Sequence, residues 1–341
     1  MNYLGIDLSK RDFHAVVMDQ AGVILHSHKY QNTKEDVLAV LAHCPDKPSI
    51  VIEATQNWMW LVNLLKQQEI DEVTLAHPLK TKAIASARIK NDELDATTLA
   101  HLLRSNLVPP SYIATPEEQE DRELSRARCQ LVKQQTWCKN QVHSLLTKEN
   151  LIPSVSDLFG KKGRQWLESV TPDLPQAKQL VLNQWLMLLT DTRARVKDLE
   201  AAIHQKCLGN QQVELLQTIP GFGEITSFVI VAEIGGNIRR FPTGKQFASY
   251  LGLVPSLYQS GKTKRLGSIT KLGNPYARWV LVQTAQRLVR NDEFYRLAYA
   301  ALALRRGKKK AIVAIARKLA VLSWRILVDQ RPYQAQAPNT G

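Results

Sequence analysis

Apolar and polar positions along the first 110 residues alternate between short runs typical of strands and segments with helical spacing. The first three runs are joined by tight turns, which predicts an antiparallel start to a sheet. Helical spacing follows Asn32–Thr33, returns from Trp58 to Leu65 and begins again at Asn91. The predicted strands cover residues 3–8, 14–18, 23–26, 49–53 and 73–75. The pattern therefore predicts an α/β domain over residues 1–112.

Long helices replace this alternation from Pro116 to about Lys148 and again around residues 185–203. Residues spaced three or four apart on the first helix are Leu124, Ala127, Leu131, Gln134, Cys138, Gln141 and Leu145. Those on the second are Trp185, Leu189, Thr192, Val196, Leu199 and Ile203. Two such seams predict a helical hairpin or an intermolecular coiled coil over residues 113–208. We interpret this segment as a spacer or an oligomerisation arm.

Residues 209–330 predict a third, mostly helical domain, followed by a flexible polar tail at 331–341. Its first helices flank the string Ile219-Pro220-Gly221-Phe222-Gly223, which has the layout of a helix-hairpin-helix motif. In such a motif the amides of the turn and the next helix N-terminus accept a backbone phosphate. A tight helix–helix turn without a ligand is the alternative. Gly221 and Gly223 are the predicted contacts.

Charge is unevenly distributed along the 341 residues, whose formal net charge is +14. Residues 236–341 contain 20 Lys and Arg but only 3 Asp and Glu, whereas 25 bases and 28 acids precede them. An excess confined to one domain predicts that this domain binds a polyanion, DNA or RNA. The hydrophobic fraction of 44% is that of a globular protein, which excludes a disordered chain.

The cysteines and the N-terminus indicate the compartment. Cys44, Cys129, Cys138 and Cys207 form no C-x-x-C pair and lack the Cys/His spacing of zinc sites, so free thiols in a reducing compartment are expected. The first residues, MNYLGIDLSK, lack the layout of a signal peptide, and no apolar run approaches the ~18 residues that span a bilayer. We expect a cytoplasmic protein with no membrane partner.

The basic third contains a glycine-punctuated polar stretch, Tyr258 to Gly267, which we interpret as a loop with Ser260 as candidate nucleophile. A solvated surface turn is the alternative. All eight histidines precede residue 205, so a Ser-His-Asp triad within this domain is not expected, and cations or metal-bound carboxylates are better activators. The predicted phosphate contacts are Lys262, Lys264, Arg265, Lys271 and Arg278.

Four carboxylates in the α/β domain occupy positions that suit metal binding. Asp7 and Glu53 end apolar strands, while Asp92 and Asp95 lie three residues apart at the start of a helix and face the same way. Hard oxygen ligands of this kind are those that Mg²⁺ or Mn²⁺ prefers, and two such ions can assist phosphoryl transfer. Helix caps and turn residues remain the alternative interpretation.

A second basic segment, Arg305-Arg306-Gly307-Lys308-Lys309-Lys310, is predicted to open a helix that runs to residue 328. Cations at a helix N-terminus oppose its dipole. We therefore expect an external anion here, the backbone of DNA or RNA.

The ordered motifs of this chain resemble the DEDD transposases of bacterial insertion sequences, a family that includes the Piv and MooV DNA invertases and the bridge-RNA-guided recombinases. The resemblance covers about residues 3–328. It rests on Gly5-Ile6-Asp7, Ile52-Glu53-Ala54-Thr55, Asn91-Asp92-Glu93-Leu94-Asp95-Ala96, Ile219-Pro220-Gly221-Phe222-Gly223 and Ser260-Gly261-Lys262-Thr263-Lys264-Arg265-Leu266-Gly267.

This resemblance implies an architecture and a chemistry. It implies a RuvC-like, ribonuclease-H-type α/β domain whose Asp7, Glu53, Asp92 and Asp95 bind Mg²⁺ or Mn²⁺, then the coiled-coil spacer and a C-terminal transposase domain. Ser260 would attack DNA to form a 5′-phosphoserine linkage. A tetramer, double-stranded donor and target DNA, and a structured bridge RNA are implied as well. A metal-dependent junction nuclease without a covalent intermediate and a non-catalytic architectural nucleic-acid-binding protein remain alternatives.

Overall fold

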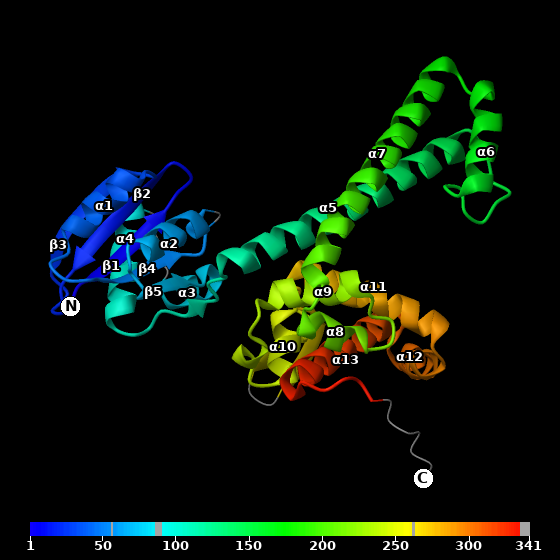
Figure 1. Ribbon diagram of the computed structural model, residues 1–341. Helices are drawn as coiled ribbons and strands as arrows, with labels where there is room; N and C mark the ends of the chain where they lie inside the picture. The colour runs from blue at the N-terminus through cyan, green and yellow to red at the C-terminus, as the bar shows by residue number, and fades with distance from the viewer. Residues whose placement is uncertain (56, 86–90, 261–262, 335–341) are drawn as a thin grey trace, which may run out of the picture. The chain divides into compact units, whose positions relative to one another are not determined.

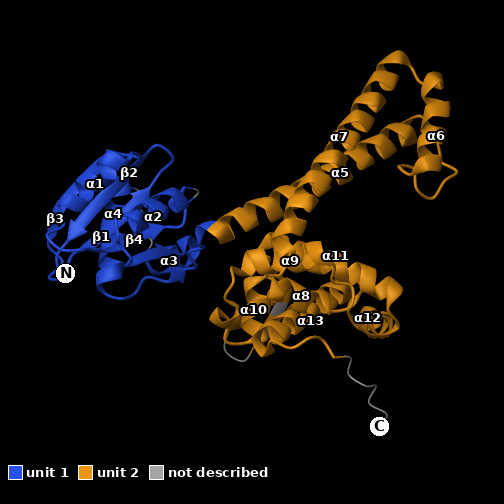
Figure 2. Ribbon diagram, viewed as in Figure 1, with its two compact units in different colours: residues 1–116 blue, residues 117–341 orange. Residues whose placement is uncertain are grey.

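The computed structural model describes residues 1–55, 57–85, 91–260 and 263–334 (Figure 1). The chain divides into two compact units, an N-terminal unit, Met1–Pro116, and a helical unit, Glu117–Gly341 (Figure 2). The described helices are all too short or too polar to cross a membrane. Part of the predicted tail, residues 335–341, lies outside the described residues.

The N-terminal unit is a six-stranded sheet covered by helices, which confirms the predicted α/β domain. The strand order is β3-β2-β1-β4-β5-β6, with β1 antiparallel to β2 and parallel to β4. The strands are β1 (Tyr3–Leu8), β2 (Asp12–Met18), β3 (Ile24–Gln31), β4 (Ser49–Glu53), β5 (Val73–Ala76) and β6 (Pro110–Ser111). The helices are α1 (Lys34–Ala42), α2 (Trp58–Gln67), α3 (Pro78–Ile84) and α4 (Asp92–Arg104).

Alternate residues of β1 and β4 face opposite sides of this sheet. On one side, Leu4, Ile6 and Leu8 are buried in a cluster with residues of α1 and α2. On the other side, Gly5 packs against α4, because a Cβ at Gly5 would meet the backbone of Ala96 and Ala100. The odd-numbered residues of β1 therefore face α4.

The helical unit contains every element after residue 116. Its longest helices are α5 (Pro116–Lys148) and α7 (Gln176–Cys207), separated by α6 (Lys161–Val170) and the 3₁₀ turn Thr171–Asp173. The shorter elements are α8 (Gln211–Gln217), α9 (Glu224–Ile234), a 3₁₀ turn (Ile238–Arg240), α10 (Gly244–Tyr250), β7 (Pro255–Ser260), β8 (Thr263–Ile269), α11 (Pro275–Asn291), α12 (Glu293–Arg306) and α13 (Lys308–Asp329).

α5 and α7 form an antiparallel helical hairpin, one of the two predicted arrangements. Arg128 donates two hydrogen bonds to Glu200, and the rings of Trp137 and Trp185 meet edge to face at 4.9 Å. The predicted α7 seam is largely buried. Of the predicted α5 seam, Cys138 is fully buried and Leu124 and Leu145 pack half-buried against the two hydrophobic clusters, while the other members are not part of either cluster. The first half of α5 packs on the helices of the C-terminal cluster, and its second half packs on α6 and α7. The buried residues of α5 therefore do not follow a single heptad stripe. Its buried residues are Ser125, Cys129, Cys138, Val142 and Leu146.

Two further elements differ from the sequence prediction. The stretch around Ser260 is a β-hairpin, in which Ser260 pairs with Thr263, and not a loop. The helix α12 was not predicted, and Arg305 and Arg306 form its last turn. These two cations therefore complement a helix dipole, and only Lys308–Lys310 lie at a helix N-terminus.

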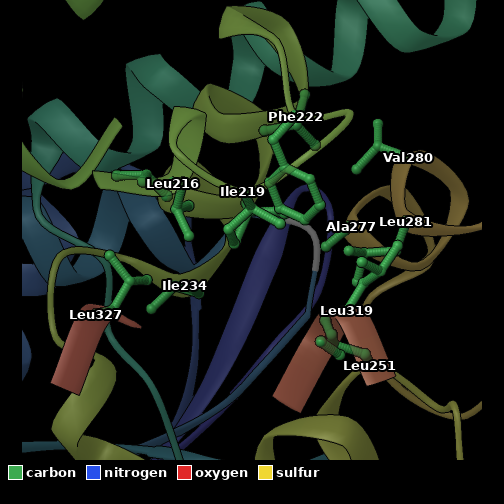
Figure 3. Close-up of a cluster of buried hydrophobic side chains, with 14 of the residues drawn as sticks. Leu216, Ile219, Phe222, Ile234, Leu251, Ala277, Val280, Leu281, Leu319 and Leu327 are labelled. Carbon is green, nitrogen blue, oxygen red and sulfur yellow. The ribbon is translucent and has the colours of Figure 1, made fainter. Parts of the chain in front are cut away.

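One hydrophobic cluster joins the short helices of the helical unit. Ile219 and Phe222, from the turn between α8 and α9, point into the same cluster as Leu281 of α11 and Leu319 of α13 (Figure 3). Both turn residues are buried, whereas Gly221 between them and Gly223 directly after Phe222 are exposed. A tight turn therefore joins α8 and α9, and the helix-hairpin-helix interpretation of this segment stays a prediction.

A buried carboxylate lies at the edge of this cluster. Glu233 of α9, whose side chain is 1% exposed, pairs with both Nε and Nη2 of Arg126 at 2.8 Å. Asn274, before α11, donates to the same carboxylate at 2.6 Å, and Tyr250 donates to the main-chain oxygen of Glu233. Glu233 therefore connects α5, α9, the end of α10 and the start of α11.

Replacing Arg126 with methionine should lower the free energy of unfolding of the full chain by about 3 kcal/mol, because the Glu233 carboxylate stays buried without its cation. Chemical denaturation followed by tryptophan fluorescence measures the loss. Arg195→Met is the matched control, because the Arg195–Asp191 pair on α7 is exposed and such pairs add little to stability. Equal stability of the two variants would contradict the assigned role.

Candidate functional site

The four predicted acidic residues lie at one end of the sheet and at the start of α4. Ile6 pairs with Ile52 in the parallel register of β1 and β4, and one further step places Asp7 beside Glu53. Both follow residues that face α1 and α2, so both face the α4 side of the sheet. Asp92 and Asp95 occupy the first turn of α4, and all four side chains are half-buried.

Small residues let α4 approach the strand that carries Asp7. An added Cβ at Gly5 would overlap the Ala96 carbonyl oxygen and lie 2.7 Å from the Ala100 nitrogen. Asp7 is two residues beyond Gly5 on the same face of β1, and Asp95 directly precedes Ala96. The glycine therefore fixes how closely the first turn of α4 lies to the carboxyl end of β1.

His14 is a polar neighbour of these acids that the sequence did not reveal. It stands opposite Asp7 in the β1–β2 pairing, and its Nε2 lies 3.0 Å from the Ser27 hydroxyl, which donates to Glu93 at 2.9 Å. Burial lowers the pKa of His14, while the carboxylates of Glu93 and Asp92 act in the opposite direction. The contacts connect β2, β3 and the first turn of α4.

The donor chemistry of the four acids fits a hard divalent cation, since half-buried carboxylates from strand ends and a helix start supply oxygen ligands. Within the described residues, however, no three His, Cys, Asp or Glu side chains are arranged closely enough to hold a metal ion. The role of Asp7, Glu53, Asp92 and Asp95 as metal ligands therefore stays a prediction. The four cysteines are free thiols, as expected, and burial raises the pKa of Cys207 to about 12.

Ser260 ends β7 and is exposed, and the neighbouring side chain of Tyr258 is 70% exposed. Arg265 pairs with Tyr258 across the hairpin and is exposed as well. Gly261 and Lys262 lie outside the described residues, as does the side chain of Lys264. The hairpin thus presents a hydroxyl and a guanidinium to solvent, which suits a nucleic-acid substrate.

Main-chain hydrogen bonds close the base of this hairpin. Thr270 and Asn274 donate from their amides to the carbonyls of Val254 and Tyr250, at 2.9 and 3.0 Å. Gly273, at φ +103°, allows this approach, because a Cβ there would overlap the Tyr250 carbonyl oxygen. A two-stranded ribbon alone is marginally stable. The main-chain hydrogen bonds at its base therefore hold the hairpin, and Asn274 connects this base to the Glu233 carboxylate.

The remaining predicted contacts differ in their surroundings. Arg278 donates to the Leu251 carbonyl at 2.9 Å, and burial lowers its pKa, so part of this guanidinium holds the end of α10. Lys271 is exposed at φ +54°. Glu224, in the first turn after Gly223, pairs with His204 at 2.8 Å and adds an acidic group beside the predicted phosphate-binding turn. The contacts of Arg278, Lys271 and the two glycines with nucleic acid stay predictions.

Two family models match this chain. A transposase model of the DEDD, IS110 type covers residues 4–150, and a model for the IS116/IS110/IS902 transposase family covers residues 213–300. A probable family 20 transposase of Pseudomonas aeruginosa is 31% identical over 234 residues, which are 65% of this chain and 67% of the relative. The chain belongs to the IS116/IS110/IS902 family of transposases.

Two further relatives agree with this assignment. The transposase for insertion sequence element IS1111A of Coxiella burnetii is 30% identical over 65% of this chain and 62% of its own length. The transposase for insertion sequence element IS1328 of Yersinia enterocolitica is 25% identical over 94% and 95% of the two chains. The matches include both parts of this transposase that carry the predicted acids and the predicted serine.

Replacing Gly5 with alanine should loosen the contact between β1 and α4, because the Ala96 backbone cannot move aside as a flexible side chain could. We expect a loss of about 2–3 kcal/mol in the stability of the N-terminal unit. Hydrogen exchange of the β1 and α4 amides measures it locally. Gly223→Ala is the control, since a Cβ there meets no atom within 4 Å. Unchanged protection in Gly5→Ala would contradict the packing argument.

Proposed function

We propose that this transposase cuts and rejoins DNA by using two groups of residues, the acids of the N-terminal unit and the serine of the hairpin. The observation that supports the proposal is the position of Asp7 and Glu53 on neighbouring parallel strands, on the face of the sheet against which α4 packs. Family membership supports DNA as the substrate. The acids Asp7, Glu53, Asp92 and Asp95 would bind Mg²⁺ or Mn²⁺.

In the proposed reaction, the Oγ of Ser260 attacks a phosphodiester. A bond forms between Oγ and phosphorus as the bond from phosphorus to the 3′ oxygen breaks, which leaves a 3′-hydroxyl and a 5′-phosphoserine link. The serine proton passes to a general base, and the departing 3′ oxygen takes up a proton. The metal would stabilise the charge that develops on the phosphate. Rejoining reverses these steps with a new 3′-hydroxyl, so no nucleotide cofactor is consumed.

Basic residues of the helical unit would hold the nucleic-acid backbone. Arg265 is exposed beside the serine, and Lys308–Lys310 lie at the start of α13, where a phosphate would relieve their repulsion with the helix dipole. The full proposed set is Lys262, Lys264, Arg265, Lys271, Arg278, Gly221, Gly223, Arg305, Arg306, Lys308, Lys309 and Lys310.

We further propose a structured guide RNA and a homo-oligomer, a dimer or tetramer, as partners. Support comes from the resemblance to the bridge-RNA-guided recombinases and from the excess of 20 bases over 3 acids in residues 236–341. Sequencing the RNA that copurifies with the protein should recover one recurrent structured transcript. A random sample of cellular RNA would contradict the guide.

Ser260→Ala and Asp7→Ala should each abolish recombination of a donor and a target plasmid, since one lacks the nucleophile and the other a metal ligand. Ser268→Ala is the matched control, an exposed serine on the other strand of the hairpin. Activity recovered on mixing the two inactive proteins would indicate that the acids and the serine act between subunits.

Retained recombination by Ser260→Ala would refute the serine mechanism. If the wild-type protein instead releases free ends with no attached protein, the acids act alone as a hydrolytic nuclease, in keeping with a RuvC-like reaction.

Replacing Lys308, Lys309 and Lys310 together with glutamine should lower the salt dependence of DNA binding. Each lost phosphate contact reduces the slope of log K against log salt by about 0.9, so the triple variant should lose roughly 2 to 3. Fluorescence anisotropy with a labelled duplex at several salt concentrations measures the slope. Lys161→Gln with Lys162→Gln, two exposed cations that open α6, is the control. Equal slopes in the two variants would contradict a specific role for the α13 lysines.

A further inference from the structure

The helix α12 carries two apolar faces, and only one of them packs within the helical unit. Tyr295 is buried, and Ala298, Tyr299 and Leu302 pack against the same hydrophobic cluster. The other face consists of Phe294, Leu297, Ala301 and Leu304, which we name the outer stripe. Its three large side chains are 69%, 63% and 90% exposed.

The spacing of the outer stripe is that of a helix–helix contact. Its members follow one another at three, four and three residues, the a and d positions of a heptad, over about 15 Å of helix. Single exposed apolar residues are common on protein surfaces, but a contiguous apolar stripe with charged residues at its ends marks an interaction site. This stripe therefore needs a partner helix with a matching narrow apolar face.

We propose that α12 pairs in antiparallel orientation with α12 of a second copy of this chain. The two-fold axis then crosses the helix pair at the height of residue 299. Phe294 of one copy lies level with Leu304 of the other, and Leu297 lies level with Ala301. The same two contacts then occur twice, as an isologous interface requires. Each large side chain faces a residue of the same stripe, and the small Ala301 makes room for Leu297.

The charges at the ends of α12 favour this antiparallel orientation. Asp292 caps the helix and Glu293 begins it, whereas Arg305 and Arg306 end it. Antiparallel pairing brings the acidic end of one copy level with the basic end of the other and opposes the two helix dipoles. Parallel pairing would place like charges together. A nucleic acid would contact cations, but the four members of the stripe are apolar, so a second protein helix is the better occupant.

This contact is independent of the proposed chemistry, because none of the four stripe residues belongs to the acidic group or the serine hairpin. It adds a defined surface through which two copies associate. Failure of the α12 pairing would therefore leave the serine proposal intact, and failure of the serine proposal would leave the pairing intact.

Cysteine crosslinking of the full-length protein tests the pairing. Ala300 is exposed beside the stripe and close to the two-fold axis, so Ala300→Cys should give a covalent dimer in high yield with a short bismaleimide. Arg296→Cys is the control, an exposed position one helical turn before Ala300 and therefore farther from the two-fold axis, so the short linker should not reach the same position of the second copy. The wild-type protein reports any background from its four native thiols, three of which are buried. Equal yields for the two variants would overturn the proposal.

A charge at the most exposed stripe position provides a second test. Leu304→Glu should fold normally, because this side chain is 90% exposed, yet it should weaken self-association by at least about tenfold and abolish the Ala300→Cys crosslink. Analytical ultracentrifugation without nucleic acid measures the association. Unchanged association would show that the stripe does not hold two copies together and would overturn the pairing. So would a loss of DNA binding at constant oligomeric state, which would identify nucleic acid as the occupant.

Discussion

The buried carboxylate of Glu233 is the interaction on which the arrangement of the helical unit depends. It accepts hydrogen bonds from Nε and Nη2 of Arg126 on the long helix α5 and from the side-chain amide of Asn274 at the start of α11. A carboxylate with 1% exposure requires such partners, because water cannot solvate its charge. The helical hairpin and the base of the serine hairpin are thereby fixed by one charged group.

The two units use different interactions to fix the positions of the predicted functional residues. In the helical unit, hydrogen bonds and an ion pair hold the base of an otherwise exposed hairpin, so Ser260 extends from a fixed foundation. In the N-terminal unit, the absence of a side chain at Gly5 brings the backbone of α4 close to β1. A transposase that works on DNA backbones has use for both, since a reactive group displaced by about 1 Å loses much of its effect.

Periodicity predicted the elements that have one apolar face. Strands β1, β2, β4 and β5 and the bounds of α5 follow from the sequence, as do the positions of the four acids near strand ends and at a helix start, whereas β3 runs to Gln31, past its predicted end, and β6 was not predicted. The helix α12 was not predicted, because apolar residues on two of its sides obscure the helical period of its sequence. The hairpin strands around Ser260 are polar and exposed, so they lack the alternation of a half-buried strand. The contact of His14 with Ser27 depends on strand register, which no local pattern encodes.

We propose that the exposed serine of the anchored hairpin becomes covalently joined to DNA. Mass spectrometry of the peptide that stays attached after wild-type protein is trapped on a cleavable donor, and the DNA is digested, measures this most directly. We expect a nucleotide remnant joined through its 5′ phosphate to Ser260. An adduct on another residue, or cleaved DNA with free 5′ phosphates and no attached peptide, would contradict it.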